Sequence, residues 1–142
     1  MNIRKISRRT VLVVDEEPLM RWSLVELLTR EGYLVVEADT AAGALGHLSP
    51  GHPPIDLVIT DLRLPDQDGT TILREIRNTH PACPIIVMTA FGTPETVAEA
   101  LRLGAYDVLN KPFDLDRLAA HVSGALEAAG ILGRHDTHDS GR

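Results

Sequence analysis

The sequence predicts an α/β fold, in which a doubly wound five-stranded parallel sheet carries helices on both faces. Short apolar runs of strand length recur along the chain, at residues 11–14, 34–36, 57–60, 85–88 and 107–110. Segments with apolar residues at helical spacing separate these runs. Such alternation favours parallel strands that are joined by right-handed crossover helices.

The first two crossover segments have clear helix signals of unequal strength. Pro18 suits a first helical position, and the apolar residues after it recur at helical spacing until Gly32 ends the segment. Residues 40–48 form a weaker helical pattern, because Gly43 and Gly46 each cost about 1 kcal/mol relative to alanine.

Each of the three later helices is predicted to begin after a capping residue. Asp68, Thr93 and Asp114 precede the apolar patterns, and their side chains can accept hydrogen bonds from backbone N–H groups of the first turn. The stripe predicted to be buried in the helix after Thr93 consists of Val97, Ala100, Leu101 and Leu103.

Polar side chains follow four of the predicted strands. They are Asp15 and Glu16 after the first strand, Asp61 after the third, Thr89 after the fourth and Lys111 after the last. The carboxyl ends of parallel strands meet at one edge of an open α/β sheet, where ligands bind. Clustered carboxylates repel one another, by roughly 1 kcal/mol for a pair 4 Å apart in water. A divalent cation and a lysine would relieve this repulsion, so the pattern predicts a metal-assisted phosphoryl site.

Length, charge and cysteine content set broad bounds. A chain of 142 residues suggests one domain, and the net charge of −6 argues against direct nucleic-acid contact or binding to an anionic membrane. The single cysteine, Cys83, excludes an internal disulfide and favours a cytoplasmic location. The first apolar run is too short for a secretory signal or a membrane span.

Four segments together carry a family resemblance. In chain order they read VLVVDEE, VITDLRLPDQDG, VMTAFG and GAYDVLNKPFD. This set resembles the receiver domain of two-component response regulators over roughly residues 9–128. The residues of these motifs are similar to those of the nitrogen-regulatory branch. The resemblance implies the flavodoxin-like strand order 2-1-3-4-5.

The resemblance also implies a role for each strand-end residue. Asp61 matches the phosphoacceptor, which receives a phosphoryl group from a histidine kinase or a phosphotransfer protein. Asp15 and Glu16 match the acidic pair that holds Mg²⁺ together with Asp61, and Lys111 matches the lysine that pairs with a phosphoryl oxygen. Thr89 matches the switch hydroxyl, which hydrogen-bonds the phosphoryl group.

Three further positions qualify this assignment. Tyr106 matches the switch aromatic, whose ring turns inward when Thr89 moves; the alternative is a half-exposed tyrosine at the sheet edge. The bond between Lys111 and Pro112 matches one that is cis in the family. Glu16 replaces the commoner aspartate, and its extra methylene moves the carboxylate by roughly 1.5 Å, so a different rotamer or a water would carry it to the metal.

Other functional classes fit less well. A haloacid-dehalogenase-type phosphatase would need a general acid two residues after Asp61, where Arg63 stands and cannot donate a proton at neutral pH. A dinucleotide-binding domain would need glycines after the first strand, where Glu17 and Pro18 stand instead. The remaining alternative is a receiver-like interaction module with weak or no phosphorylation because of Glu16.

These observations predict the organisation and partners of the chain. We expect a flexible basic N-terminus at residues 1–8, a receiver domain at 9–128, and a flexible tail or linker at 129–142, where the spacing of His135 and His138 is a weak metal signal. We expect no enzyme activity beyond Mg²⁺-dependent phosphorylation and dephosphorylation of the chain itself. A homodimer through the fourth helix, fifth strand and fifth helix is expected, with exposed candidates Glu95, Glu99, Arg102, Asp107, Asp116, Arg117 and His121.

Overall fold

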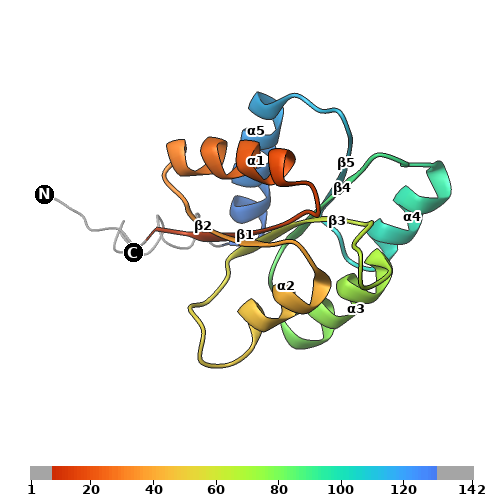
Figure 1. The fold of residues 1–142 in the computed structure, drawn as a ribbon, viewed down its shortest axis with the longest axis horizontal. Coiled ribbons are helices and arrows are strands. Elements are labelled where there is room, and N and C mark those ends of the chain that lie inside the picture. Colours follow the sequence, from red (N-terminus) through yellow and green to blue (C-terminus); the bar gives the residue numbers. More distant parts are fainter. Residues whose placement is uncertain (1–7, 131–142) are drawn as a thin grey trace, which may run out of the picture.

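The computed structural model describes residues 8–130, which form a parallel sheet covered by helices on both faces (Figure 1). The strands are β1 (Thr10–Val14), β2 (Leu34–Ala38), β3 (Leu57–Asp61), β4 (Ile85–Thr89) and β5 (Asp107–Asn110). The helices are α1 (Pro18–Arg30), α2 (Ala41–Leu48), α3 (Gly69–Thr79), α4 (Pro94–Arg102) and α5 (Leu115–Ala128). Each predicted strand is present, and the first four extend one or two residues beyond the apolar run.

The sheet has five parallel strands in the order β2-β1-β3-β4-β5. The order reverses at β1, which pairs with β2 on one side and with β3 on the other. This confirms the doubly wound fold and places the reversal between the carboxyl ends of β1 and β3. Ligands of open α/β sheets bind at such a point.

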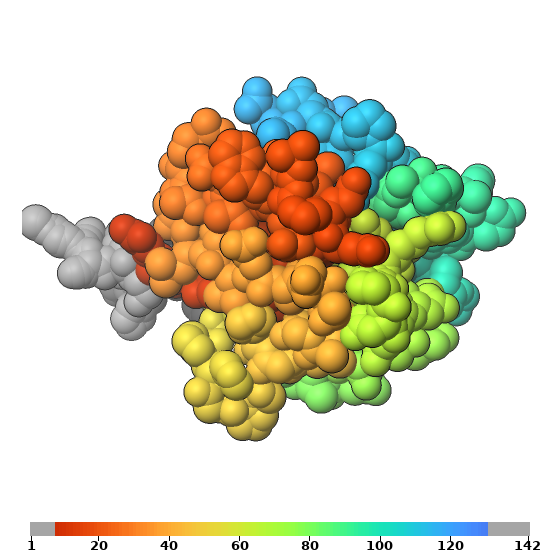
Figure 2. All heavy atoms as spheres, viewed as in Figure 1, coloured from red at the N-terminus to blue at the C-terminus, as the bar shows by residue number. Residues whose placement is uncertain are grey.

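Two apolar layers enclose the sheet. Leu24, Leu28, Leu118 and Val122 pack α1 and α5 against one face, and the side chains of α2, α3 and α4 cover the other. The space-filling view shows the side chains of α1 above and α2 below closing over the sheet (Figure 2). All residues of β1, β3 and β4 are buried, which explains why their sequences are continuous apolar runs rather than alternating patterns.

The predicted helix caps are present. The side chains of Asp68, Thr93 and Asp114 each accept a hydrogen bond from a backbone N–H in the first turn of α3, α4 and α5. Thr40 does the same for α2, and Pro18 occupies the start of α1. These caps fix where each helix begins after the loop that leaves the sheet.

An additional cap at α2 was not predicted from the sequence. Asp66, in the loop between β3 and α3, accepts hydrogen bonds from the N–H groups of Ala41 at 2.8 Å and Ala42 at 2.9 Å. These two backbone hydrogen bonds lower the pKa of Asp66. The loop that follows β3 is therefore tied to the start of α2.

The predicted stripe of α4 is only partly buried. Ala100 is buried and Val97 and Leu103 are half-buried, but Leu101 is 47% exposed. The reason is the position of α4 at the margin of the sheet, beside edge strand β5 and helix α3. A helix there covers the core with a narrower face than a helix over the centre of the sheet.

Three predictions about the chain ends lie outside the described residues, namely the flexible N-terminal segment up to residue 7, the flexible tail or linker beyond residue 130, and the spacing of His135 and His138. Within residues 8–130, no helix has the length and apolar character needed to cross a lipid bilayer.

Candidate functional site

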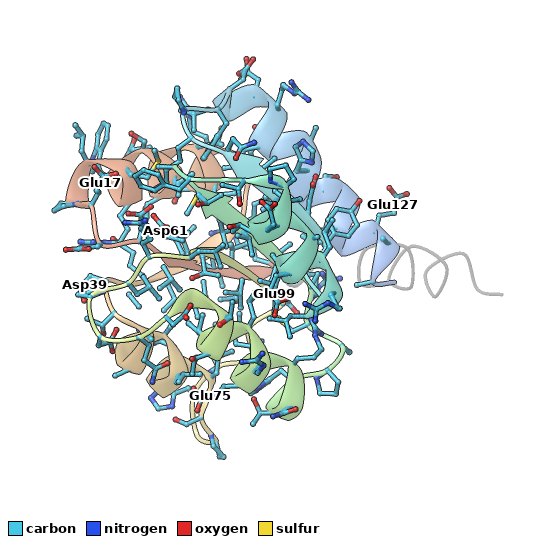
Figure 3. All side chains as sticks on the ribbon, turned by 90° about the vertical axis from the view of Figure 1, so that its right-hand side faces the viewer. Glu17, Asp39, Asp61, Glu75, Glu99 and Glu127 are labelled. Carbon is cyan, nitrogen blue, oxygen red and sulfur yellow. The ribbon has the colours of Figure 1, made fainter. Side chains whose placement is uncertain are left out.

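One ammonium group joins the carboxyl ends of three strands. The Nζ of Lys111, just after β5, lies 2.7 Å from Oδ2 of Asp15 and 2.7 Å from Oδ2 of Asp61. Asp15 is fully buried and Asp61 is 8% exposed. Figure 3 looks onto this edge of the sheet, with Asp61 left of the centre and Glu17, the residue before α1, above it and further to the left. The prediction that these strand ends gather is confirmed for Asp15, Asp61 and Lys111.

The two carboxylates determine the charge state of Lys111. Burial by itself lowers the pKa of Lys111, but the hydrogen bonds that Lys111 donates to Asp15 and Asp61 and the charges of both carboxylates outweigh burial and raise the pKa. Lys111 therefore remains an ammonium at neutral pH. Together the three side chains carry one net negative charge when both carboxylates are ionised.

The second oxygen of each carboxylate is held by its own loop. Oδ1 of Asp15 accepts a hydrogen bond from the N–H of Glu17 at 2.8 Å, and Oδ1 of Asp61 accepts one from Arg63 at 2.8 Å. Bonds of this kind, from an aspartate to the backbone two residues on, fix the side-chain direction. Both carboxylates are thus aimed at the same point, where Lys111 lies.

Glu16 does not join this cluster. Its side chain is exposed, and among residues 8–130 no three acidic, histidine or cysteine side chains lie close enough to hold a metal ion. The predicted trio of Asp15, Glu16 and Asp61 is therefore not assembled. Neighbouring residues of an extended segment point to opposite sides, so a buried Asp15 leaves Glu16 facing solvent. Asp15 and Asp61 still offer the hard oxygen donors that Mg²⁺ prefers.

Arg21 supports the loop that carries Asp15, a role not predicted from the sequence. Its Nη1 donates to the backbone oxygen of Asp15 at 2.7 Å, and its Nε lies 3.2 Å from Oε1 of Glu37. The only signal in the sequence is its place in the first turn of a helix after an acidic loop. That signal does not separate Arg21 from an ordinary surface arginine.

Arg63 and Phe91 form a second contact that the sequence did not reveal. The guanidinium carbon of Arg63 lies 4.1 Å from the centre of the Phe91 ring, an arrangement in which the aromatic face attracts the cation. Arg63 follows Asp61 by two residues and Phe91 follows Thr89 by two. The pair therefore joins the loops that leave β3 and β4 at the mouth of the site.

Thr89 lies at the same edge of the sheet, but its side chain is hydrogen-bonded to the backbone. It is 2% exposed, and its Oγ1 accepts a hydrogen bond from the N–H of Phe91 at 3.0 Å. Its backbone oxygen accepts from the N–H of Lys111 at 2.8 Å. Thr89 also lines an open hollow of about 590 Å³ between α3 and α4.

Tyr106 is not brought to Thr89. Its N–H donates to the oxygen of Ile85 at the start of β4, whereas Thr89, at the end of β4, pairs with Asn110. Four residues of strand separate Ile85 from Thr89, a distance of about 13 Å. The strand register therefore places Tyr106 beside the start of β4 and Thr89 at the end of β4. The role of Tyr106 as the switch aromatic, whose ring turns inward when Thr89 moves, stays a prediction.

Tyr106 instead rests on the last helix. The ring is 42% exposed, and its hydroxyl lies 3.2 Å from the position that a Cβ would occupy on Gly124 of α5. This is the alternative expectation, a half-exposed tyrosine at the sheet edge. The cis bond between Lys111 and Pro112 is present, as the resemblance implied.

The surface predicted for partners contains fewer free charges than expected. Nδ1 of His121 lies 2.6 Å from Oδ2 of Asp107, and Glu99 pairs with Arg102 and, at 3.8 Å, with Arg74. Glu99, Asp107 and His121 are half-buried rather than exposed. The large exposed apolar side chains of this surface are Leu101 and Tyr106.

Comparison with known proteins gives a consistent picture. The family model of the response regulator receiver domain matches residues 11–123. The DNA-binding transcriptional regulator NtrC of Proteus hauseri is 36% identical over 85% of this chain, and the regulatory protein AtoC of Escherichia coli K12 is 39% identical over 82%. The chain spans about a quarter of the length of each of these two relatives.

Solved structures show the same similarity in three dimensions. A CheY-like receiver domain from Methanospirillum hungatei JF-1 superposes with a TM-score of 0.82 at 27% identity, covering 87% of this chain and 98% of that one. The receiver domain of NtrX from Brucella abortus has a TM-score of 0.76 at 37% identity, covering 82% of this chain and 98% of its own.

Proposed function

The chain belongs to the response regulator receiver domain family of two-component signalling, and on that premise we propose that Asp61 is its phosphoacceptor. The observation that carries the proposal is the placement of Asp61. Its carboxylate ends β3 at the reversal point of the sheet, next to buried Asp15 and 2.7 Å from the Lys111 ammonium.

The proposed reaction is a phosphoryl transfer. A carboxylate oxygen of Asp61 forms a bond to the phosphorus of a phosphohistidine on the donor, and the bond between phosphorus and the histidine nitrogen breaks. The nitrogen keeps the bonding electron pair and later takes a proton. The product is an acyl phosphate on Asp61, which water hydrolyses back to the carboxylate and inorganic phosphate.

Lys111 supplies the fixed positive charge. It is held beside Asp61 before the reaction, so little reorganisation is needed when a phosphoryl oxygen replaces a carboxylate oxygen as its partner. Thr89 would give up its hydrogen bond from the N–H of Phe91 and donate to the phosphoryl group. That change would move the loop after β4 and alter the outer surface.

Mg²⁺ is the proposed metal, with Asp15 and Asp61 as its carboxylate ligands and Glu16 reaching it through a water. When bound, Mg²⁺ neutralises charge on the transferring phosphoryl group. Asp15 is suited to this role because its carboxylate is buried and its direction is fixed by the N–H of Glu17. No turnover of an external substrate beyond the phosphodonor is proposed.

The proposed partners are a histidine kinase or phosphotransfer protein and a second copy of the chain. The second copy would dock on the surface of α4, β5 and α5, where Leu101 and Tyr106 are exposed. The proposed receiver domain comprises residues 9–128. The proposed compartment is the cytoplasm, because the single cysteine, Cys83, forms no internal disulfide.

The test is incubation with acetyl phosphate and Mg²⁺, followed by intact-mass spectrometry and peptide mapping. A phosphoryl adduct on the peptide that contains Asp61 is the expected result. A chain that remains unmodified under conditions that label an established receiver domain would contradict the proposal and favour a passive interaction module.

A further inference from the structure

Asn110, the last residue of β5, is seated directly on a glycine of the neighbouring loop. A Cβ at Gly92 would overlap the amide oxygen of Asn110 in its present position and would lie 3.0 Å from Asn110 Cγ and 3.2 Å from Thr89 Cγ2. Asn110 is exposed, so its amide would have to leave this position to admit the Cβ. Gly92 follows Phe91 in the loop between β4 and α4. The Asn110 amide and the Thr89 methyl group therefore share the space above Gly92, which we name the Gly92 notch.

Space, rather than backbone conformation, explains the glycine at this position. The described glycines with positive φ are Gly32, Gly51, Gly104 and Gly130, and Gly92 is not among them. An L-residue could adopt the backbone conformation of Gly92. The three atoms nearest to the position of such a Cβ belong to the Asn110 amide and the Thr89 methyl group.

The notch lies between the charged centre of the site and the loop after β4. Asn110 pairs with Thr89 in the sheet, and the next residue, Lys111, donates its N–H to the Thr89 oxygen at 2.8 Å. Phe91, the residue before Gly92, donates its N–H to the Thr89 hydroxyl. The Asn110 side chain therefore borders the loop that orients that hydroxyl.

We propose that Asn110 is a positioning residue for phosphoryl transfer, acting through the Gly92 notch on Thr89. The amide fills the notch and holds the loop after β4 at a fixed distance from Lys111. The Thr89 hydroxyl is thereby placed where a phosphoryl group on Asp61 would meet it. This inference rests on the proposed function, since it assigns Asn110 a role in that same reaction.

The experiment compares Gly92→Ala with the double variant Gly92→Ala/Asn110→Ala. The added methyl group collides with Asn110, so the single variant should lower the maximal rate of labelling by acetyl phosphate about tenfold, the scale expected when a reacting group is misplaced by less than 1 Å. In the double variant the amide is absent, and the added methyl group occupies the notch in its place without a collision. The double variant should therefore regain most of the lost rate.

Three readouts separate positioning from loss of stability. The acetyl phosphate concentration at half-maximal rate should stay constant, because donor binding is untouched. The methyl NMR signal of Thr89 should shift in Gly92→Ala and return in the double variant. The melting temperature should not follow the labelling rate across the set.

Two glycines supply matched controls. A Cβ on Gly46 in α2 meets nothing within 4 Å, so Gly46→Ala should label at the wild-type rate. A Cβ on Gly69 would strike the backbone of Leu62, and Asn110→Ala should not rescue Gly69→Ala, since a backbone obstacle is not removed by truncating Asn110.

The outcomes are distinct. Wild-type labelling by Gly92→Ala, or no rescue by Asn110→Ala, would overturn the inference. If Gly92→Ala does not fold, Asn110→Ala alone decides, because it must slow labelling at an unchanged melting temperature. If the wild-type chain is never labelled, the proposed function fails, and the Thr89 methyl signal still decides whether the notch couples Asn110 to Thr89.

Discussion

The Lys111 ammonium donates a hydrogen bond to Asp61 at 2.7 Å, across fifty residues of sequence and from the far edge strand of the sheet. The same ammonium bonds Asp15 at 2.7 Å. One cation therefore offsets the repulsion of two buried carboxylates, and the strand ends that carry them are held together. The first three predictions concern Asp61, Asp15 and Lys111.

Asp61→Asn should abolish labelling by acetyl phosphate and binding of beryllofluoride while the fold stays intact. The amide is nearly isosteric with the carboxylate but is not a nucleophile, and it keeps an oxygen for the N–H of Arg63. Intact-mass spectrometry measures the adduct, and circular dichroism the fold. Asp66→Asn is the control, because Asp66 bonds only α2 and should still permit labelling. An undiminished adduct on Asp61→Asn would refute the assignment.

Labelling should require Mg²⁺ or Mn²⁺ and stop in excess EDTA. Asp15→Ala should weaken metal binding far more than Glu16→Ala does, because Asp15 is buried beside Asp61 and Glu16 faces solvent. Titration of labelling rate against metal concentration gives the two affinities, and the fluorescence of Trp22, on α1, offers a second signal. Equal losses from both variants would show that Glu16 is a direct ligand.

Lys111→Met should lower the free energy of unfolding at pH 7 by about 3–5 kcal/mol, the usual cost of leaving buried charges without their partner. Urea denaturation measures the change. Because the pKa of Lys111 is raised in the folded state, its stabilising effect is complete below the pKa of an unfolded lysine, roughly 10.4, and is lost as pH rises through the folded value. The difference between wild type and variant should therefore shrink above about pH 10.4.

Other groups that titrate in that range do not confuse this comparison. Burial raises the pKa of Tyr33 and raises the pKa of Cys83 to about 11, and both destabilise the fold in alkali. They act equally in wild type and in Lys111→Met. A constant difference between the two proteins up to pH 12 would mean that Lys111 is not the charged partner of Asp15 and Asp61.

Asp66→Ala should lower the melting temperature at pH 7 through loss of the two hydrogen bonds at the start of α2. The pKa of Asp66 is lowered by these bonds, so their stabilising effect is present above the pKa of an unfolded aspartate, about 3.9, and is lost as pH falls through the folded value. Calorimetry from pH 7 to pH 2.5 should show the two melting temperatures converging. A difference in melting temperature that stays constant down to pH 2.5 would contradict the capping role of Asp66.

Beryllofluoride should promote self-association through the surface of α4, β5 and α5. Leu101→Asp should prevent it, since Leu101 is 47% exposed on α4. Leu34→Asp is the matched control, because Leu34 is also 47% exposed but lies on β2 at the opposite edge of the sheet. Sedimentation velocity measures the mass. Equal effects of both variants would place the interface elsewhere.

The sequence was sufficient for the fold and for the charged centre of the site. Continuous apolar runs, together with Pro18, Asp68, Thr93 and Asp114 at helix starts, depend on local chemistry that the chain displays directly. Asp15, Asp61 and Lys111 could be placed together because each directly follows a strand. The common edge of a parallel sheet then brings them into contact.

Features that depend on register and side-chain direction could not be predicted. The separation of Tyr106 from Thr89 follows from the pairing of β4 and β5, which the sequence does not display. Glu16 was grouped with Asp15 by adjacency, although neighbouring residues face opposite ways. The Asp66 cap and the stacking of Arg63 on Phe91 join separate loops, and no local pattern reveals such contacts.

The close approach of Tyr106 to Gly124 has a consequence for the residues that relatives carry at these two positions. Glycine in the middle of α5 lowers the stability of the helix by about 1 kcal/mol relative to alanine, so selection for stability alone would favour its replacement. The Tyr106 hydroxyl, 3.2 Å from where a Cβ would stand, opposes that replacement. Positions 106 and 124 should consequently co-vary among relatives, with a small residue at 124 wherever 106 is a tyrosine, and an alignment of receiver domains would reveal this pairing.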